Sequence, residues 1–304
     1  MDLAAEAKSP ASLNRKVLDR SQGAPSNTSL QALAGSVPLV VYWQTADLEP
    51  AVPVLKQSEV LAVPVWNVTM KVAALGTKVF GFGYSTERSF AAFAKFAGNK
   101  LKSYRFAIIS SSAEPFTTQG KAFIEETKSL GNTVVFEEKA ETASVDFKAI
   151  IMRAKKENCD TVFAVLPADA LIALIKAARA ALFGGKILVG DSFFSTELDA
   201  LGNDAEGIHI LQAWSDDAAF KTKYAAKYGG EPDGITLGAA ALGYDLIQCI
   251  EATGSNPSSG SISYAWHSTP CEGLTGKTQF SGERIAQRVK RVLTVKGGKF
   301  ELAD

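Results

Sequence analysis

Short apolar runs alternate along this chain with segments in which apolar residues recur every three or four positions. The runs Arg105–Ser110 and Thr161–Val165 are almost continuously apolar, a pattern that favours parallel strands covered on both faces. By the same criterion we predict strands at Arg15–Leu18, Leu39–Tyr42, Ala62–Val65, Val79–Gly81, Arg105–Ser110, Thr133–Phe136, Thr161–Val165, Lys186–Val189 and Ile208–Gln212.

The intervening segments have helical periodicity. Asp146–Glu157, for example, carries its apolar residues on a single stripe. Gly254–Ser263 is rich in Gly, Ser, Asn and Pro and is expected to be a loop, and the chain should close with a hairpin of Arg291–Lys296 and Lys299–Leu302. The predicted helices are Glu87–Ala97, Thr118–Ser129, Asp146–Glu157, Ala168–Ala181, Phe220–Tyr228 and Ile235–Ala252. Strands alternating with helices predict an α/β fold with doubly wound parallel sheets.

The length, charge and cysteine content of the chain restrict the classes of function that we expect. A chain of 304 residues exceeds one ordinary core and predicts two lobes. Its 32 Lys and Arg balance 32 Asp and Glu, so a nucleic-acid partner is not expected. No apolar run approaches the ~20 residues that span a bilayer, and the first residues lack the pattern of a signal peptide. Three dispersed cysteines and two histidines predict neither a metal site nor a cofactor, and the spacing leaves a Cys249–Cys271 disulfide open.

The catalytic and nucleotide-binding motifs that a chain of this class could carry are absent. Gly273–Thr278 resembles a phosphate-binding loop but has Cys271 where the first glycine is required. Gly81-Phe-Gly83 lacks the third glycine of a dinucleotide-binding turn. Neither histidine has a local serine partner, so we predict that the protein is not an enzyme.

Four stretches, in order, resemble type I periplasmic solute-binding proteins of the branched-chain amino-acid (Leu/Ile/Val) family. They are Asp204–Gly207; Tyr224–Pro232 with Gly243-Tyr-Asp245 and Ala252–Ser255; Gly273–Phe280; and Val295–Phe300. The resemblance implies two lobes with a hinge, lobe 1 from residues 1–101 and 216–282 and lobe 2 from 102–215 and 283–304. The chain should cross between them near Leu101–Ser103, Gln212–Ser215 and Glu283–Arg291. Compared with the family, the first strand of lobe 1 is expected to be missing, as in a truncated chain.

The resemblance also implies a function. The protein would be the substrate-binding component of an ABC transporter in the periplasm, capturing an amino-acid-like or aromatic carboxylate by hinge closure and presenting it to the permease subunits. The alternative is a ligand-sensing regulator or receptor domain of the same fold, similar to cytoplasmic amide sensors.

Candidate ligand-binding residues follow the carboxyl ends of the predicted strands, where open α/β folds bind ligands. Matched to the family pattern, Thr45, Asn67 and Thr69 would hold a ligand carboxylate, and Trp66 with Trp43 suggests a flat apolar ligand body. In lobe 2 the match places an aromatic residue against the ligand and an acid or hydroxyl against its ammonium. These residues are Phe116, Asp191 and Ser192.

Overall fold

The computed structural model describes residues 31–33, 35–280 and 282–303, so the predicted strand Arg15–Leu18 lies outside the described residues. By their internal contacts the described residues form two units. Unit 1 contains the chain up to Ser85 and Ser215–Arg288, and unit 2 contains Thr86–Trp214 and the chain from Val289 onward.

Unit 2 is a seven-stranded sheet between helices, in the order β10-β9-β8-β7-β6-β4-β5. The strands from β5 to β8 are parallel, and β9 and β10 add an antiparallel hairpin at the β8 edge. The bounds are β4 Arg105–Ser110, β5 Thr133–Lys139, β6 Thr161–Val165, β7 Lys186–Val189, β8 His209–Gln212, β9 Arg291–Lys296 and β10 Lys299–Leu302. This is the predicted doubly wound arrangement.

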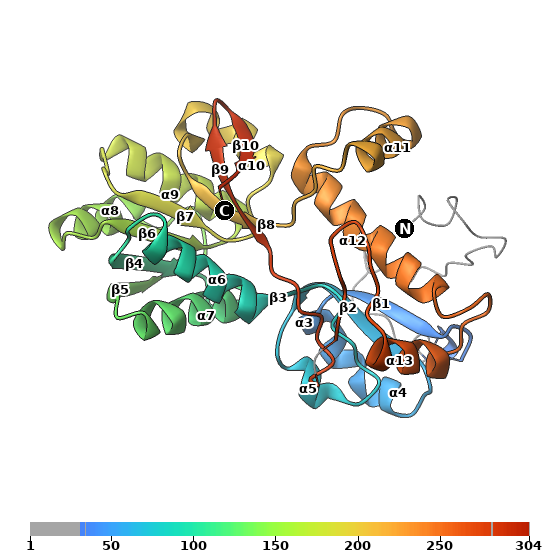
Figure 1. Ribbon diagram of the computed structural model, residues 1–304. Helices are drawn as coiled ribbons and strands as arrows, with labels where there is room; N and C mark the ends of the chain where they lie inside the picture. The colour runs from blue at the N-terminus through green and yellow to red at the C-terminus, as the bar shows by residue number, and fades with distance from the viewer. Residues whose placement is uncertain (1–30, 34, 281, 304) are drawn as a thin grey trace. The chain divides into compact units, whose positions relative to one another are not determined.

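Helices cover both faces of this sheet, with α6 and α7 on one side and α8 and α9 on the other (Figure 1). Six buried phenylalanines belong to the core cluster that α6 and α7 help to form, and Phe123 stacks on Phe163 with ring centroids 3.7 Å apart. The bounds are α6 Thr86–Asn99, α7 Phe116–Ser129, α8 Phe147–Lys156, α9 Ala168–Ala180 and α10 Ser195–Leu201. The predicted lobe boundary places the segment of α6 in lobe 1, but Phe90 and Phe93 bury it in unit 2, so the first crossing lies at Ser85–Thr86.

Unit 1 is built on a parallel sheet with the order β1-β2-β3 among the described residues. A core cluster packs β2 against the short helices that follow β1. The bounds are β1 Leu39–Gln44, β2 Leu61–Val68, β3 Tyr84–Ser85, α3 Thr45–Leu48, α4 Val52–Lys56, α5 Val72–Leu75, α11 Ala218–Tyr228, α12 Gly234–Glu251 and α13 Ser259–Ser268.

Two predictions in unit 1 were wrong. Val79–Gly81 makes only isolated bridges, and the third strand is Tyr84–Ser85 instead. A Cβ on Gly83 would lie 2.1 Å from the carbonyl oxygen of Val65, so this glycine lets the chain approach β2 closely.

The predicted loop Gly254–Ser263 is instead half helix. Ser258 caps α13 by accepting a hydrogen bond from the backbone N–H of Ser261. Ile262 and Trp266, four residues apart, are then buried on one side of the helix. Trp266 packs against Phe80, Phe82 and Phe280, and these tertiary contacts outweigh the loop-forming composition.

Candidate ligand-binding site

The carboxyl edge of the unit 1 sheet brings four predicted site residues together. The Thr45 hydroxyl, at the start of α3, donates to the carbonyl of Asn67 at 3.4 Å and accepts from the backbone N–H of Thr69 at 3.0 Å. It therefore fixes the segment leaving β2. The Thr45 side chain is fully buried, and its two hydrogen bonds shape the edge. Contact of Thr45 with a ligand stays a prediction.

Aromatic rings form a row across the same three strands. Trp43 of β1 stacks on Trp66 of β2 with centroids 4.9 Å apart and planes 11° apart, and Trp66 meets the edge of Tyr84 in β3 at 6.2 Å. Trp66 and Tyr84 are buried, whereas Trp43 is 55% exposed. Unit 1 thus presents a supported indole at its carboxyl edge, a surface suited to a flat apolar group.

Thr69 differs from Thr45 in how its side chain is used. Its hydroxyl is buried and has no hydrogen-bond partner among the described residues. Leaving a buried polar group unpaired costs about 1–3 kcal/mol, so such groups mark places where a ligand or water completes the bonding.

In unit 2 the predicted acid is already paired. Asp191 follows β7 and is buried; one carboxylate oxygen accepts from the side-chain amide of Gln119 at 2.7 Å, and the other contacts the ammonium of Lys290. Burial lowers the pKa of Lys290 below its ordinary value, and the charge of Asp191 opposes that shift. Sequence reasoning missed Lys290, because two residues 99 positions apart carry no local signal of their pairing.

The neighbours of Asp191 are also engaged. Gln212 donates its side-chain amide to the carbonyls of Asp191 and Phe193, at 2.8 and 3.0 Å. The Ser192 hydroxyl donates to the carbonyl of Leu166 at 2.7 Å. The carboxamide oxygens of Gln119 and Gln212 are buried without a partner in the described part of the chain, so neutral acceptors remain at this edge.

Phe116 is the first residue of α7 and lies partly buried against the unit 2 core. Beside it, the hydroxyl run after β4 is tied to Glu141, whose carboxylate accepts from the Ser111 hydroxyl at 2.5 Å and the Ser112 backbone N–H at 2.7 Å. The bond from Ser111 is the main reason why the pKa of Glu141 is lowered. Contact of Phe116 with a ligand stays a prediction.

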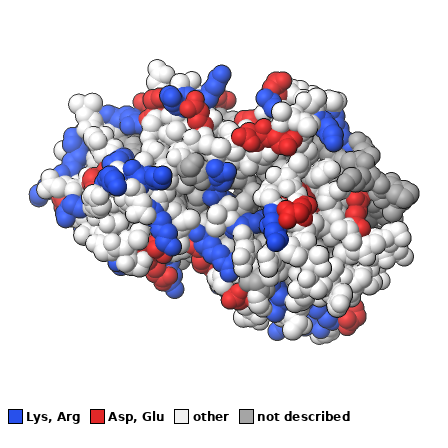
Figure 2. Space-filling model, viewed as in Figure 1, with Lys and Arg blue, Asp and Glu red and all other residues white. Residues whose placement is uncertain are grey.

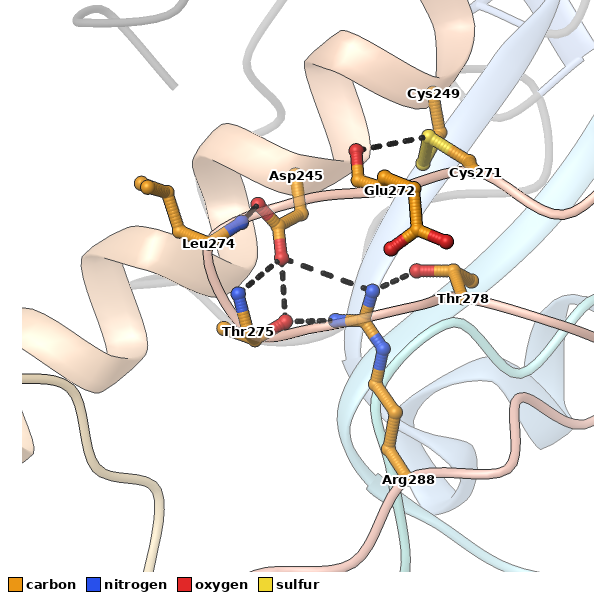
Figure 3. Close-up of polar contacts among 8 residues, drawn as sticks. All are labelled: Asp245, Cys249, Cys271, Glu272, Leu274, Thr275, Thr278 and Arg288. Carbon is orange, nitrogen blue, oxygen red and sulfur yellow. Dashed lines mark hydrogen bonds and ion pairs between the residues drawn. A yellow bond between two sulfur atoms is a disulfide. The ribbon is translucent and has the colours of Figure 1, made fainter. Parts of the chain in front are cut away.

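A second buried ion pair lies in unit 1. Asp245 of α12 accepts from the backbone N–H groups of Leu274 and Thr275, at 2.6 and 2.8 Å, and from the Thr275 hydroxyl. Arg288 lies 3.7 Å from this carboxylate and donates to the hydroxyls of Thr275 and Thr278 (Figure 3). Close by, Cys249 and Cys271 form a disulfide, which resolves the pairing that the sequence left open.

This cluster reaches the aromatic row through Tyr84. Burial raises the pKa of Tyr84 to about 12; Arg288 opposes the rise and Asp245 adds to it. Arg288 also lies over the ring of Phe82, 4.7 Å from its centroid. The backbone N–H of Ser85, also in β3, donates to the carbonyl of Arg288 at 3.2 Å.

The described residues also bear on three other possibilities: a metal site, a membrane-spanning helix and a basic surface. Within residues 31–33, 35–280 and 282–303, His, Cys, Asp and Glu form no group of three that could hold a metal ion. Over the same ranges, no helix has the length and apolarity needed to cross a membrane. The face in Figure 2 shows Lys and Arg interspersed with Asp and Glu rather than gathered in a basic stripe.

Comparison with known proteins identifies the family. The sequence pattern of the family described as "Periplasmic binding protein" matches residues 31–299. The chain belongs to this family. Its members are solute binders and not enzymes, so the predictions of a periplasmic solute-binding family, of an α/β fold with two parallel-sheet lobes and of a non-enzymatic function are confirmed.

Solved structures of similar proteins share the family fold. A leucine-binding protein from Thermotoga maritima is 22% identical, with a TM-score of 0.78 over 100% of this chain and 91% of that one. A solute-binding protein from Rhodopseudomonas palustris in complex with p-hydroxybenzoic acid is 21% identical, with a TM-score of 0.78 over 98% and 87%. An isoleucine complex from Streptococcus pneumoniae is 19% identical, with a TM-score of 0.74 over 91% and 83%.

Proposed function

We propose that this protein is the solute-binding component of an ABC transporter and that it captures a small carboxylate with a flat apolar body. The observation that carries the proposal is the unpaired, buried hydroxyl of Thr69, which lies at the same carboxyl edge of the sheet as the Trp43–Trp66 stack. A hydroxyl donates well to a carboxylate, and the stacked indoles suit an aromatic or other flat group. Similar proteins were solved with benzoate, with 4-hydroxybenzoate and with leucine.

The proposal also covers the cellular compartment of the protein and its partner. The Cys249–Cys271 disulfide supports an oxidising compartment such as the periplasm, because disulfides rarely persist in reducing cytosol. There the ligand would be passed to permease subunits. Hinge closure, expected from the resemblance, belongs to the same proposal, and small-angle scattering with and without ligand would test it.

Calorimetry on Thr69 variants tests the ligand site, with benzoate and 4-hydroxybenzoate as probes. We expect Thr69→Val to weaken binding by about 10- to 100-fold, since a hydrogen bond to a charged group contributes about 1.5–3 kcal/mol. Thr69→Ser keeps the hydroxyl and should bind nearly as the parent protein does. Benzamide, which lacks the charge, should bind weakly to all three proteins.

Binding measurements on Trp43 variants test the proposed site independently of Thr69. Trp43→Ala removes an exposed ring that Trp66 supports, and should weaken binding of the aromatic probes by about 2- to 10-fold. Trp43→Phe should restore most of the loss. Unchanged affinity in both Thr69→Val and Trp43→Ala would place the ligand elsewhere and refute the proposed site.

A further inference from the structure

The acid expected to meet a ligand ammonium is neutralised from within unit 2. Asp191 and Lys290 are 5% and 3% exposed, and both oxygens of the Asp191 carboxylate are occupied, one by Lys290 and one by Gln119. A ligand ammonium leaving water needs a free acid, because an unpaired buried charge costs several kcal/mol. To bind Asp191, the ammonium would have to displace Lys290.

Lys290 has little freedom to give way. Its backbone N–H donates to the hydroxyl of Ser89 at 3.1 Å, and the next residue begins β9, whose first four residues pair with β8. The side chain is enclosed, so withdrawing it from Asp191 would leave each of the two buried charges without its counter-ion. The pair is therefore a fixed part of unit 2.

Two of the polar atoms left beside Asp191 are neutral acceptors. The carboxamide oxygens of Gln119 and Gln212 are buried and lack partners among the residues that the structure describes. Such acceptors suit a hydroxyl or an ordered water better than a full positive charge. Glu141, an acid that follows β5, is held by Ser111 and Ser112.

We propose that Lys290 is a specificity-determining residue, which by pairing with Asp191 selects carboxylates that carry no ammonium group over amino acids of the same shape. This inference rests on the proposed function and narrows its substrate class. Lys290 acts through Asp191 and need not touch the ligand.

The test uses ligand pairs that differ only in the amino group: L-phenylalanine with 3-phenylpropanoate, and L-leucine with 4-methylpentanoate. By calorimetry, the parent protein should bind the preferred deaminated acid at least about 100-fold more tightly than its amino-acid counterpart. Lys290→Met exposes an unpaired acid, so the ratio should fall by at least about tenfold. The double variant Asp191→Asn/Lys290→Met offers no acid and should keep the parent ratio. A purely structural role of Lys290 would change both members of each pair equally.

Lys290→Met could fail to fold, and Asp191→Asn then replaces it. That variant leaves the positive charge of Lys290 in excess, so the deaminated acid should bind at least as tightly as before and the amino acid more weakly. Equal or tighter binding of the amino acid by the parent protein overturns the inference. Loss of that binding in Glu141→Gln would show that Glu141 meets the ammonium instead. If the parent protein binds the amino acid as tightly as the deaminated acid or more tightly, only this inference fails. If the parent protein binds neither member of any pair and does not bind benzoate, the proposed function fails too.

Discussion

The two units each bury one acid paired with one base, but they solvate the charges differently. In unit 1, Asp245 receives two backbone N–H groups and a hydroxyl in addition to the nearby Arg288. In unit 2, Asp191 has Lys290 and one amide of Gln119. In unit 1 several groups of a loop therefore help to stabilise the negative charge of the buried acid, whereas in unit 2 a single lysine supplies most of that stabilisation.

The two bases come from neighbouring positions in the chain. Arg288 ends unit 1 and Lys290 lies two residues later in unit 2. The chain that crosses between the units thus delivers one cation to each of them. The comparison teaches that a buried acid can be a fixed structural element even at the position where a strand-end acid would be predicted to face a ligand.

The largest expected effect separates these two modes of compensation. Lys290→Met leaves Asp191 with one neutral donor and should destabilise the protein by about 3–5 kcal/mol. Arg288→Met leaves Asp245 with its three donors from the loop and should cost less, about 1–3 kcal/mol. Urea denaturation, followed by circular dichroism, measures both. Asp191→Asn/Lys290→Met is the control and should recover most of the loss, and an Arg288→Met penalty equal to that of Lys290→Met would break the comparison.

The sequence predicted unit 2 better than unit 1 for a physical reason. In unit 2 the strands β4, β6 and β7 and the final hairpin begin and end at the predicted residues, because long apolar runs leave few alternatives. In unit 1 the segments around Gly83 and Ser258 depend on close backbone approach and on distant aromatic contacts. Neither signal is local, so periodicity could not find the strand Tyr84–Ser85 or the helix Ser259–Ser268.

For the candidate site, the sequence predicted where the residues lie in the sheet but not which hydrogen bonds and ion pairs they make. Strand ends correctly located Thr45, Asn67 and Thr69 at one edge, since parallel strands share that edge. Which hydroxyl is used internally and which stays unpaired depends on tertiary geometry. The partner of Asp191, Lys290, directly precedes β9, 99 residues further along the chain, and one sequence alone does not reveal it.

The disulfide offers the next largest effect and concerns unit 1 alone. It closes a loop whose ends are 22 residues apart, which corresponds to about 3 kcal/mol of stability in the chain-entropy account. Cys249→Ala/Cys271→Ala should lower the free energy of unfolding by about that amount. Because Leu274 and Thr275 follow Cys271, the variant should also loosen the donors to Asp245 and increase the cost of Arg288→Met.

Non-additivity is the informative readout of that experiment. Lys290→Met lies in the other unit, and its cost should be the same with and without the disulfide. Cys159→Ala is the matched control, because Cys159 is a free thiol. If the losses of unfolding free energy caused by Arg288→Met and by the cysteine variant simply add, the donors of Leu274 and Thr275 do not depend on the disulfide to stabilise the charge of Asp245.

The smallest expected effect is a pH dependence at Tyr84, the ring that links the unit 1 ion pair to the aromatic row. Its pKa is raised to about 12 in the folded protein, against about 10 in the unfolded chain. Between these values the unfolded chain binds fewer protons, so stability must fall as the pH rises. Two pKa units correspond to about 2–3 kcal/mol. Denaturation of the parent protein and of Tyr84→Phe from pH 9.5 upward should therefore show curves that converge or cross by about this amount. Arg288→Met removes the charge that opposes the rise, so the phenolate absorbance of Tyr84 should appear at still higher pH. A lower titration midpoint in that variant would mean that Arg288 is not the charge that opposes the rise in the pKa of Tyr84.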